Sequence, residues 1–401
     1  MSDSEVTAIN EALDALLAEH DPSQESYHEF RGHQFDAGLA WVQFPKGHGG
    51  LEVRPQLQRQ VNRRLAQAGA DPMDTSQFFM ALAAPTILAH GTEEQKRRFF
   101  RPMFTGEQRW CQLFSEPGAG SDFAGLATKA ELDGDEWTVN GQKVWNTIAH
   151  IADWGMLVTR TDPQLPKHKG MTYFALDMHA EGVEVRPLRQ ITGEAEFNEV
   201  YMTDVRVPDA NRIGARGEGW RASITTLMNE RTVIGGAGGT GTPPRGSGPI
   251  AELVKTWDSL PDHERTGPRR DSLMKLWNRA EVLRLTNMRA AQNAKRGQPG
   301  PEGSVAKLAG AELHKDIYSE GINLAGMASQ VDFDYTFRRP TSVVLPGEGG
   351  SLGYLFLRAR ANSIEGGTSE ILRNIMGEQM LGLPGEPRAD KGIPWADVPK
   401  N

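Results

Sequence analysis

Residues 108–212 carry strand signals between two helical regions, and this insertion is the feature that most restricts the fold. Before about residue 105, apolar residues recur every three or four positions, which is the period of an amphipathic helix. After Gly217 the same period returns. Helices, then a compact antiparallel β block, then helices again form an unusual order. The sequence therefore predicts an α+β protein that is mostly α.

The helical period is clearest near the two ends of the chain. The positions that carry it are Val6, Ile9, Leu13, Leu16 and Leu17, then Leu273, Leu276, Trp277, Ala280 and Leu283, and finally the stretch 305–324. A capping box at Thr92 to Gln95 predicts the start of a further helix, which we expect to run to Phe104.

The middle region has the signals of an antiparallel sheet. Asp133-Gly134 and Asn140-Gly141 have the form of hairpin turns and flank an alternating strand at Trp137 and Val139. Further strands are expected at 156–159, 171–176, 183–185 and 197–202. We therefore expect four parts, namely an N-terminal helical domain at 1–107, a middle β domain at 108–213, a C-terminal helical bundle at 214–385 and a tail at 386–401.

Composition excludes several classes of protein. The net charge of −8 gives no basic footprint for nucleic acid. The only cysteine, Cys111, excludes an intramolecular disulfide and a cysteine-based zinc site, and no metal site is predicted. No apolar signal-peptide core and no run of 18 apolar residues is visible, so we expect a cytoplasmic protein without a membrane span.

Two motifs in the middle region indicate a bound cofactor. Residues 111–122 place Pro117, Gly118 and Gly120 after an apolar run and close with Ser121 and a carboxylate. Such a loop leaves backbone N–H groups free for an anion such as a diphosphate. Residues 140–147 add an aromatic side chain and a hydroxyl. Together the two motifs resemble the flavin signatures of the acyl-CoA dehydrogenase family.

The resemblance extends over nearly the whole chain and implies an N-terminal helical domain, a small β domain and a C-terminal four-helix bundle. It also implies FAD as cofactor and an acyl-CoA thioester as substrate, with Ser121 near both. The implied flavin contacts are Gln112, Leu113, Phe114, Ser115, Gly120, Ser121, Trp145, Asn146, Thr147, Gly367, Thr368, Ser369 and Glu370.

Oxidation of a saturated thioester at Cα–Cβ needs a base for the α-proton, a hydride acceptor and donors to the thioester carbonyl. Because no side chain accepts hydride, the reaction needs a cofactor. In the resembled family the base is a glutamate at one of two places. One place comes directly before the Gly-Thr pair of the C-terminal motif, which is residues 364–370 in this chain. The residue there is Gly366, and Glu365 lies one position before it.

The second place is the Glu of a Glu-Arg pair, which matches Glu230 and Arg231. We therefore predict Glu230 as the base and keep Glu365 as the alternative, because an offset of one residue turns a side chain away from its target. The resemblance places Met228, Asn229, Arg231 and Gly366 at the substrate, and the N–H of Gly366 is a candidate donor to the thioester carbonyl.

Other features separate this chain from most relatives. An Arg-x-x-Phe-Gly motif that reaches the neighbouring subunit's flavin is missing, and Asn323 to Met327 replace a Gln and a double Gly. These departures bear on the flavin contacts between subunits. The resemblance still implies a homo- or hetero-oligomer, either dimer or tetramer, and an electron-transfer flavoprotein as acceptor. The alternatives are a non-catalytic or half-site subunit of a heteromer and a flavin oxidase or monooxygenase.

A dinucleotide fingerprint at Gly236 to Gly241 is interpreted as a surface loop. No strand precedes it, and Pro243-Pro244 prevents a helix from starting there.

Overall fold

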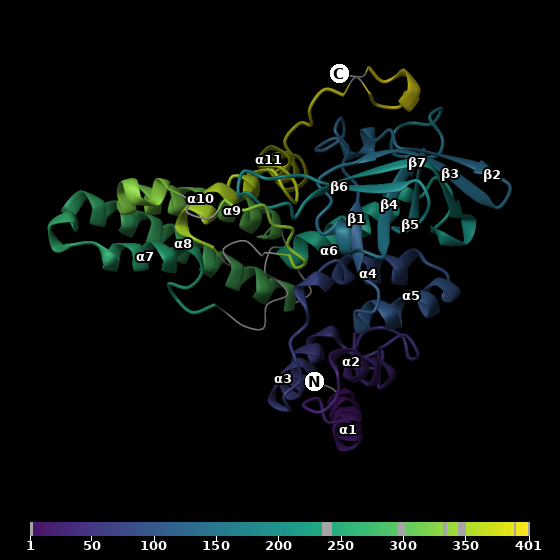
Figure 1. The fold of residues 1–401 in the computed structure, drawn as a ribbon, viewed down its shortest axis with the longest axis horizontal. Coiled ribbons are helices and arrows are strands. Elements are labelled where there is room, and N and C mark those ends of the chain that lie inside the picture. Colours follow the sequence, from purple (N-terminus) through teal and green to yellow (C-terminus); the bar gives the residue numbers. More distant parts are fainter. Residues whose placement is uncertain are drawn as a thin grey trace.

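A computed structural model describes residues 3–234, 243–295, 302–331, 335–343, 350–388 and 390–399. The fingerprint at Gly236 to Gly241 lies outside these residues. Within them the chain folds as predicted, with helices, a β domain and helices in that order (Figure 1). No helix of the described ranges is both long enough and apolar enough to cross a membrane.

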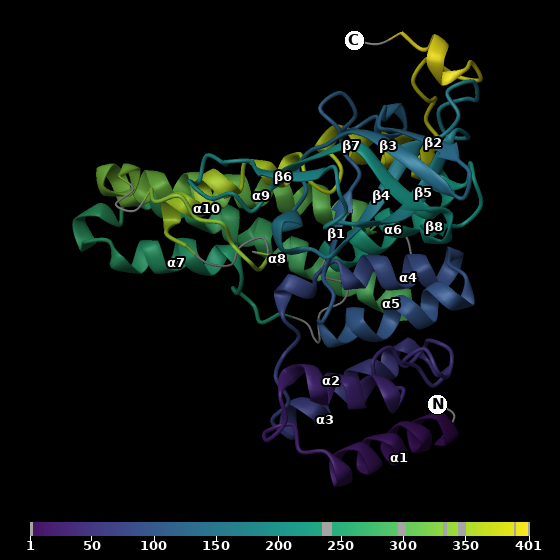
Figure 2. The ribbon, with the colours of Figure 1, turned by 45° about the vertical axis from the view of Figure 1, so that its right-hand side comes forward.

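The N-terminal helices form two layers beneath the β domain (Figure 2). The outer layer contains α1 (Asp3–Glu19), α2 (Tyr27–Asp36) and α3 (Gln58–Gln67), and the inner layer contains α4 (Met80–His90) and α5 (Glu93–Thr105). The predicted capping box is confirmed: the Thr92 hydroxyl accepts the Gln95 N–H, and the Gln95 side chain accepts the Thr92 N–H.

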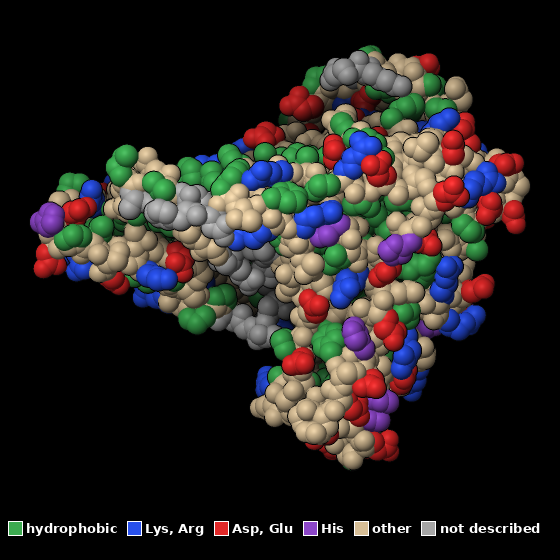
Figure 3. Space-filling model, in the orientation of Figure 1, with side chains coloured by type: hydrophobic (Ala, Val, Ile, Leu, Met, Phe, Trp, Pro, Cys, Tyr) green, Lys and Arg blue, Asp and Glu red, His purple; other side chains and the backbone are tan. Residues whose placement is uncertain are grey.

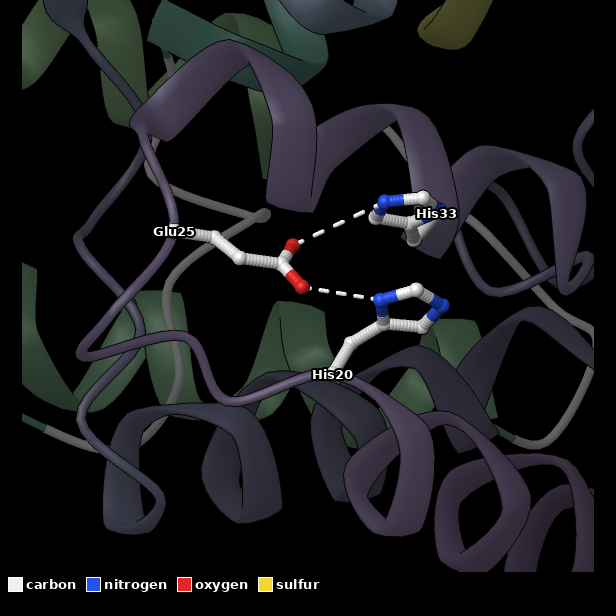
Figure 4. A group of neighbouring side chains, drawn as sticks. All are labelled: His20, Glu25 and His33. Carbon is white, nitrogen blue, oxygen red and sulfur yellow. Dashed lines mark hydrogen bonds and ion pairs between the residues drawn. The ribbon is translucent and has the colours of Figure 1, made fainter.

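A histidine–glutamate cluster joins the end of α1 to α2 (Figure 4). The Glu25 carboxylate lies 2.8 Å from Nδ1 of His20 and 3.7 Å from Nε2 of His33. The two imidazoles stack with centroids 3.5 Å apart and planes at 13°. The facing nitrogens of both histidines approach the same carboxylate, so the cluster links α1 to α2 through polar contacts.

The β domain is one sheet in the order β6-β7-β3-β2-β4-β5-β8, with β1 parallel to β4. Its strands are β1 (Trp110–Leu113), β2 (Lys129–Asp133), β3 (Glu136–Lys143), β4 (Trp154–Arg160), β5 (Met171–Asp177), β6 (Val183–Pro187), β7 (Asn198–Pro208) and β8 (Arg212–Ile213). Tyr173 packs on the α4 side, whereas its neighbour Phe174 enters the second core of the sheet. This alternation is the strand period of two.

One turn prediction is wrong. Asp133-Gly134 does join β2 to β3, but Asn140-Gly141 lies inside β3 at a register shift in its pairing with β7. A Cβ on Gly141 would lie 2.7 Å from Cα of Thr128, the residue directly before β2. The glycine therefore permits a close approach of two strands at a bulge and does not make a turn.

The C-terminal bundle extends as an arm from the β domain (Figure 1). Its helices are α6 (Gly219–Ile234), α7 (Pro249–Ser259), α8 (Gly267–Lys295), α9 (Glu302–Ala325), α10 (Leu352–Arg358) and α11 (Ser369–Ile375). Helix α6 is anchored in the centre of the molecule: Oγ1 of Thr226 lies 2.9 Å from Oγ1 of Thr86 and 3.2 Å from the hydroxyl of Tyr173.

The C-terminal tail leaves the bundle and returns to the β domain (Figure 2). The indole N–H of Trp395 donates to the carbonyl of Gly125 over 3.1 Å, and Arg160 lies over its ring. Asp390 forms an ion pair with Lys167, which also holds Asp122 at 2.8 Å. The tail therefore secures the loop that follows the first predicted flavin motif.

Candidate active site

A buried ion pair between Glu116 and Lys143 stabilises the first predicted motif. Glu116 accepts N–H groups from Ala127 and Thr128 and the ammonium of Lys143, at 2.6, 2.9 and 2.8 Å. Burial alone would raise the pKa of Glu116, but Lys143 and the backbone donors bring it below its usual value. The fully buried Lys143 also donates to the carbonyl of Phe114. Gly120 and Ser121 are left exposed at the surface of the loop.

The second predicted motif presents an aromatic side chain on a strained backbone. Trp145 has φ of 62° and an indole that is 58% exposed, and Ile148 has φ of 49°. Left-handed conformations are unfavourable for such residues and persist only where the surroundings enforce them. Reciprocal hydrogen bonds of 3.0 Å between the backbones of Asn146 and Asn198 provide that enforcement. An exposed indole held in this way suits stacking on a planar ligand.

Asn146 connects the two motifs. Its side-chain N–H donates to the carbonyl of Gln112 over 2.8 Å, so the end of β1 and the segment after β3 lie together. Its Oδ1 atom is buried and has no hydrogen-bond partner in the described part of the chain. The Thr147 side chain is half-buried beside it. An unused acceptor, a hydroxyl and an exposed indole at one place fit the ring of a flavin.

Helix α6 brings the predicted base to this place. Oε2 of Glu230 lies 3.3 Å from Nε2 of Gln112, across 118 positions of sequence. Met228 is 61% exposed, and the Asn229 amide donates back to the carbonyl of Thr225 within the helix. The side chain of Arg231 lies outside the described structure.

The alternative base is engaged elsewhere. Glu365 forms an ion pair of 3.0 Å with Arg358, whose guanidinium lies over the ring of Phe197. Phe197 in turn packs edge-on against Trp145. Through Arg358 and Phe197, Glu365 thus connects the C-terminal motif to the β domain.

The glycine pair of the C-terminal motif has a left-handed backbone conformation at both positions. Gly366 and Gly367 have φ of 60° and 93°, and their N–H groups have no hydrogen-bond partner among the described residues. Two successive amides in such a conformation form a concave site for negative charge. The side chains of the next three residues already have partners within the protein. The Thr368 hydroxyl caps α11, the Ser369 hydroxyl donates to Glu312, and Glu370 forms an ion pair with Arg373.

One charged residue of the site was missed by sequence reasoning. Lys307 on α9 is half-buried, and its ammonium donates to the carbonyl of Gly367 over 2.6 Å. Burial lowers its pKa, and the nearby carboxylates of Glu365 and Glu230 oppose that shift. A lysine on a helix has no sequence signal that separates it from a solvated one, so only the tertiary contact identifies it.

Three family models match the chain in sequence order. They describe the N-terminal, middle and C-terminal domains of acyl-CoA dehydrogenases and match residues 5–107, 111–205 and 266–381. Among curated relatives, acyl-CoA dehydrogenase FadE34 of Mycobacterium tuberculosis is 40% identical over 87% of this chain, which spans only 45% of that protein. Acyl-CoA dehydrogenase IpdE1 of the same organism is 35% identical over 87% of this chain and 86% of its own length.

Solved structures agree. The ChsE4–ChsE5 complex of Mycobacterium tuberculosis matches with a TM-score of 0.67 and 27% identity over 96% of this chain and 99% of the other. A single-residue variant of the Tcur3481–Tcur3483 steroid ACAD matches with a TM-score of 0.67 and 25% identity, over 95% of this chain and 100% of that one. The predicted fold, enzyme class and FAD cofactor are thereby confirmed, and the chain belongs to the acyl-CoA dehydrogenase family of flavoprotein oxidoreductases.

Proposed function

We propose that this chain oxidises an acyl-CoA thioester to the trans-2-enoyl-CoA, with Glu230 as the base. The observation that carries the proposal is the 3.3 Å contact between Glu230 and Gln112, because it joins the base to the first flavin motif. FAD, when bound, accepts the β-hydrogen together with its electron pair. The α-proton passes to the Glu230 carboxylate as the Cα–Cβ double bond forms.

The C-terminal glycines supply the third requirement of the reaction. Negative charge develops on the thioester oxygen as the α-proton leaves, and the free N–H groups of Gly366 and Gly367 are suited to stabilise it. Trp145, Asn146 and Thr147 would hold the flavin ring, and the 115–121 loop its diphosphate. Glu365 has a structural role in this proposal, since Arg358 already holds its carboxylate.

The test compares Glu230→Gln with Glu365→Gln under anaerobic single-turnover conditions, with flavin bleaching by substrate as the readout. In Glu230→Gln the new amide keeps the shape of the side chain but cannot accept a proton, so we expect bleaching to slow by about 10²–10⁴-fold. Glu365→Gln is expected to bleach nearly normally. Bleaching lost only in Glu365→Gln would reverse the assignment, and normal bleaching in both variants would reject the mechanism.

We propose a CoA thioester of a steroid or a similarly bulky ring system as the substrate. The support is the likeness to a structure named a steroid ACAD and the exposed apolar side chains of Ile224 and Met228 on α6, ahead of Glu230. A panel of straight, branched and ring-bearing CoA thioesters assayed with an artificial electron acceptor tests this. A preference for straight chains would contradict it.

We further propose that the chain works in a hetero-oligomer and passes electrons to an electron-transfer flavoprotein. Its surface of 20419 Å² exceeds the roughly 15,500 Å² expected for a compact monomer of this mass. The excess follows from an extended shape, in which the C-terminal arm leaves surface that a partner chain could cover. Hydrophobic side chains gather where the C-terminal helices meet the β domain (Figure 3).

Rapid oxygen consumption without an acceptor would favour the oxidase alternative instead.

A further inference from the structure

Helix α9 contacts the C-terminal motif at two points. Lys307 donates to the carbonyl of Gly367 over 2.6 Å, and Glu312 accepts the Ser369 hydroxyl over 2.9 Å. Lys315 instead donates to the hydroxyl of Ser363, one residue before the motif, over 3.1 Å. The same helix packs against α6, which carries Glu230. Only the first of these contacts reaches the backbone of the glycine pair.

Lys307 also differs from the other basic residues near the motif in its electrostatic surroundings. Glu312, Glu365 and Glu370 have their own basic partners, which are Lys315, Arg358 and Arg373. Lys307 instead donates to a peptide carbonyl and interacts electrostatically with Glu365, Glu230, Glu312 and Glu370. It is thus a half-buried cation that lies between the glycine loop and the predicted base.

We propose that Lys307 is a positioning residue that holds the Gly367 carbonyl, and thereby aims the N–H groups of Gly366 and Gly367 at the thioester oxygen. This inference rests on the proposed function. Two successive glycines with positive φ have many accessible conformations, so the loop needs an external contact to keep one of them. A charge-assisted hydrogen bond is about twice as strong as a neutral one and supplies that contact.

The position of Lys307 has an electrostatic consequence as well. Its positive charge lies one peptide unit from the donors that would face the developing negative charge of the thioester. Preorganised charge at such a point stabilises the transition state more than the bound substrate. Loss of Lys307 is therefore expected to lower kcat more than it raises KM.

The test compares Lys307→Met, Lys307→Gln and Lys307→Arg with a matched control, Lys315→Met. The control removes the same charge from the same helix but leaves the Gly367 contact intact. We expect kcat to fall about 10–10²-fold in Lys307→Met with KM within about threefold. Lys307→Gln keeps a hydrogen-bond donor without the charge, so its kcat should lie between those of Lys307→Met and the parent. Lys307→Arg should recover most of kcat. Lys315→Met should stay within about threefold of the parent.

A spectroscopic readout separates this inference from the proposed function. In the Glu230→Gln background, where turnover stops, the infrared stretch of the bound thioester carbonyl reports its polarisation. We expect the frequency of this stretch to be lower than in the free thioester, and we expect the downshift to be lost when Lys307→Met is added and kept with Lys315→Met.

A downshift that persists in Lys307→Met, or equal losses of kcat in Lys307→Met and Lys315→Met, would overturn the role of Lys307. Absence of any downshift in Glu230→Gln alone would instead count against the proposed site. If Lys307→Met does not fold, Lys307→Gln is measured in the same way.

Discussion

Some single residues in this protein have a strained backbone conformation, and Trp145 is the clearest example. Among the described non-glycine residues, Glu52, Trp145, Ile148 and Asp204 have positive φ. Trp145 combines that conformation with a large exposed apolar side chain, so neither burial nor backbone preference explains its position. Stacking on the flavin, as proposed above, would explain it.

We predict that Trp145→Gly leaves the free energy of unfolding of the apoprotein within about 1 kcal/mol of the parent. Relief of the left-handed conformation, about 1–2 kcal/mol, offsets the greater chain entropy of glycine and the lost Phe197 contact. The FAD dissociation constant should nevertheless rise by about fivefold, measured by titration of apoprotein, because a stacked aromatic contact is worth about 1 kcal/mol. Glu52→Gly, at an exposed site in the N-terminal region, relieves similar strain and should leave FAD affinity unchanged. Equal FAD affinity in Trp145→Gly and the parent would refute the assignment.

The surroundings of His314 predict that stability depends on pH. It lines a cavity of about 200 Å³ with Trp277 and Ile317, and burial lowers its pKa to about 4. The unfolded chain has a histidine pKa near 6.5, so between these values only the unfolded state takes up the proton. The free energy of unfolding should therefore be highest above pH 6.5 and fall as the pH decreases towards 4.

We predict that His314→Gln removes about 1–3 kcal/mol of this loss between about pH 6.5 and 4.5. Urea unfolding at several pH values measures it. His263→Gln, in an exposed turn before α8, should leave the pH profile as in the parent. A profile for His314→Gln that overlays the parent's would show that other groups cause the acid loss.

At the scale of elements, local signals were sufficient for helices but not for the sheet. The capping box of α5 and the apolar period of α1 and α9 depend on neighbours in sequence, and those helices formed as expected. The Asn140-Gly141 dipeptide has the same local form as a hairpin turn. It became a bulge because β2 and β7 pair with β3 on either side of it.

The candidate site shows the same division between local and distant information. Its two flavin motifs were visible because each is contiguous, and Glu230 was visible through its Glu-Arg pair. The engagement of Glu365 by Arg358 and the contact of Lys307 with Gly367 join separate elements, so no sequence spacing indicates them.

The C-terminal tail gives a prediction for one element. Trp395→Ala removes the hydrogen bond to Gly125 and the contact with Arg160, and so releases the loop that Asp122 begins. We expect the midpoint of thermal unfolding to fall by a few degrees and FAD to dissociate faster, as measured by flavin fluorescence. Trp395→Phe keeps the ring without its N–H and should show a smaller effect. Unchanged FAD release in Trp395→Ala would mean that the tail has no influence on the loop.

At the scale of the whole molecule, the missing Arg-x-x-Phe-Gly motif predicts that flavin retention depends on a partner chain. We expect the chain expressed alone to carry less than one FAD, and co-expression with a second acyl-CoA dehydrogenase chain to restore full occupancy. Absorbance of released flavin per chain, together with mass by light scattering, measures both. A monomer that retains one FAD per chain would contradict the prediction.

The hydroxyl contacts of Thr226 have a consequence for protein engineering. Thr86, Tyr173 and Thr226 come from the N-terminal, middle and C-terminal regions, yet their oxygens meet at one buried point. Each threonine hydroxyl also donates to a carbonyl of its own helix, but among the described residues the Tyr173 hydroxyl contacts Thr226 alone. A chimera that takes its C-terminal region from a relative without this threonine leaves the buried Tyr173 hydroxyl without its partner, at a cost of about 1–3 kcal/mol. Chimeras that keep all three residues should be more stable by about that amount.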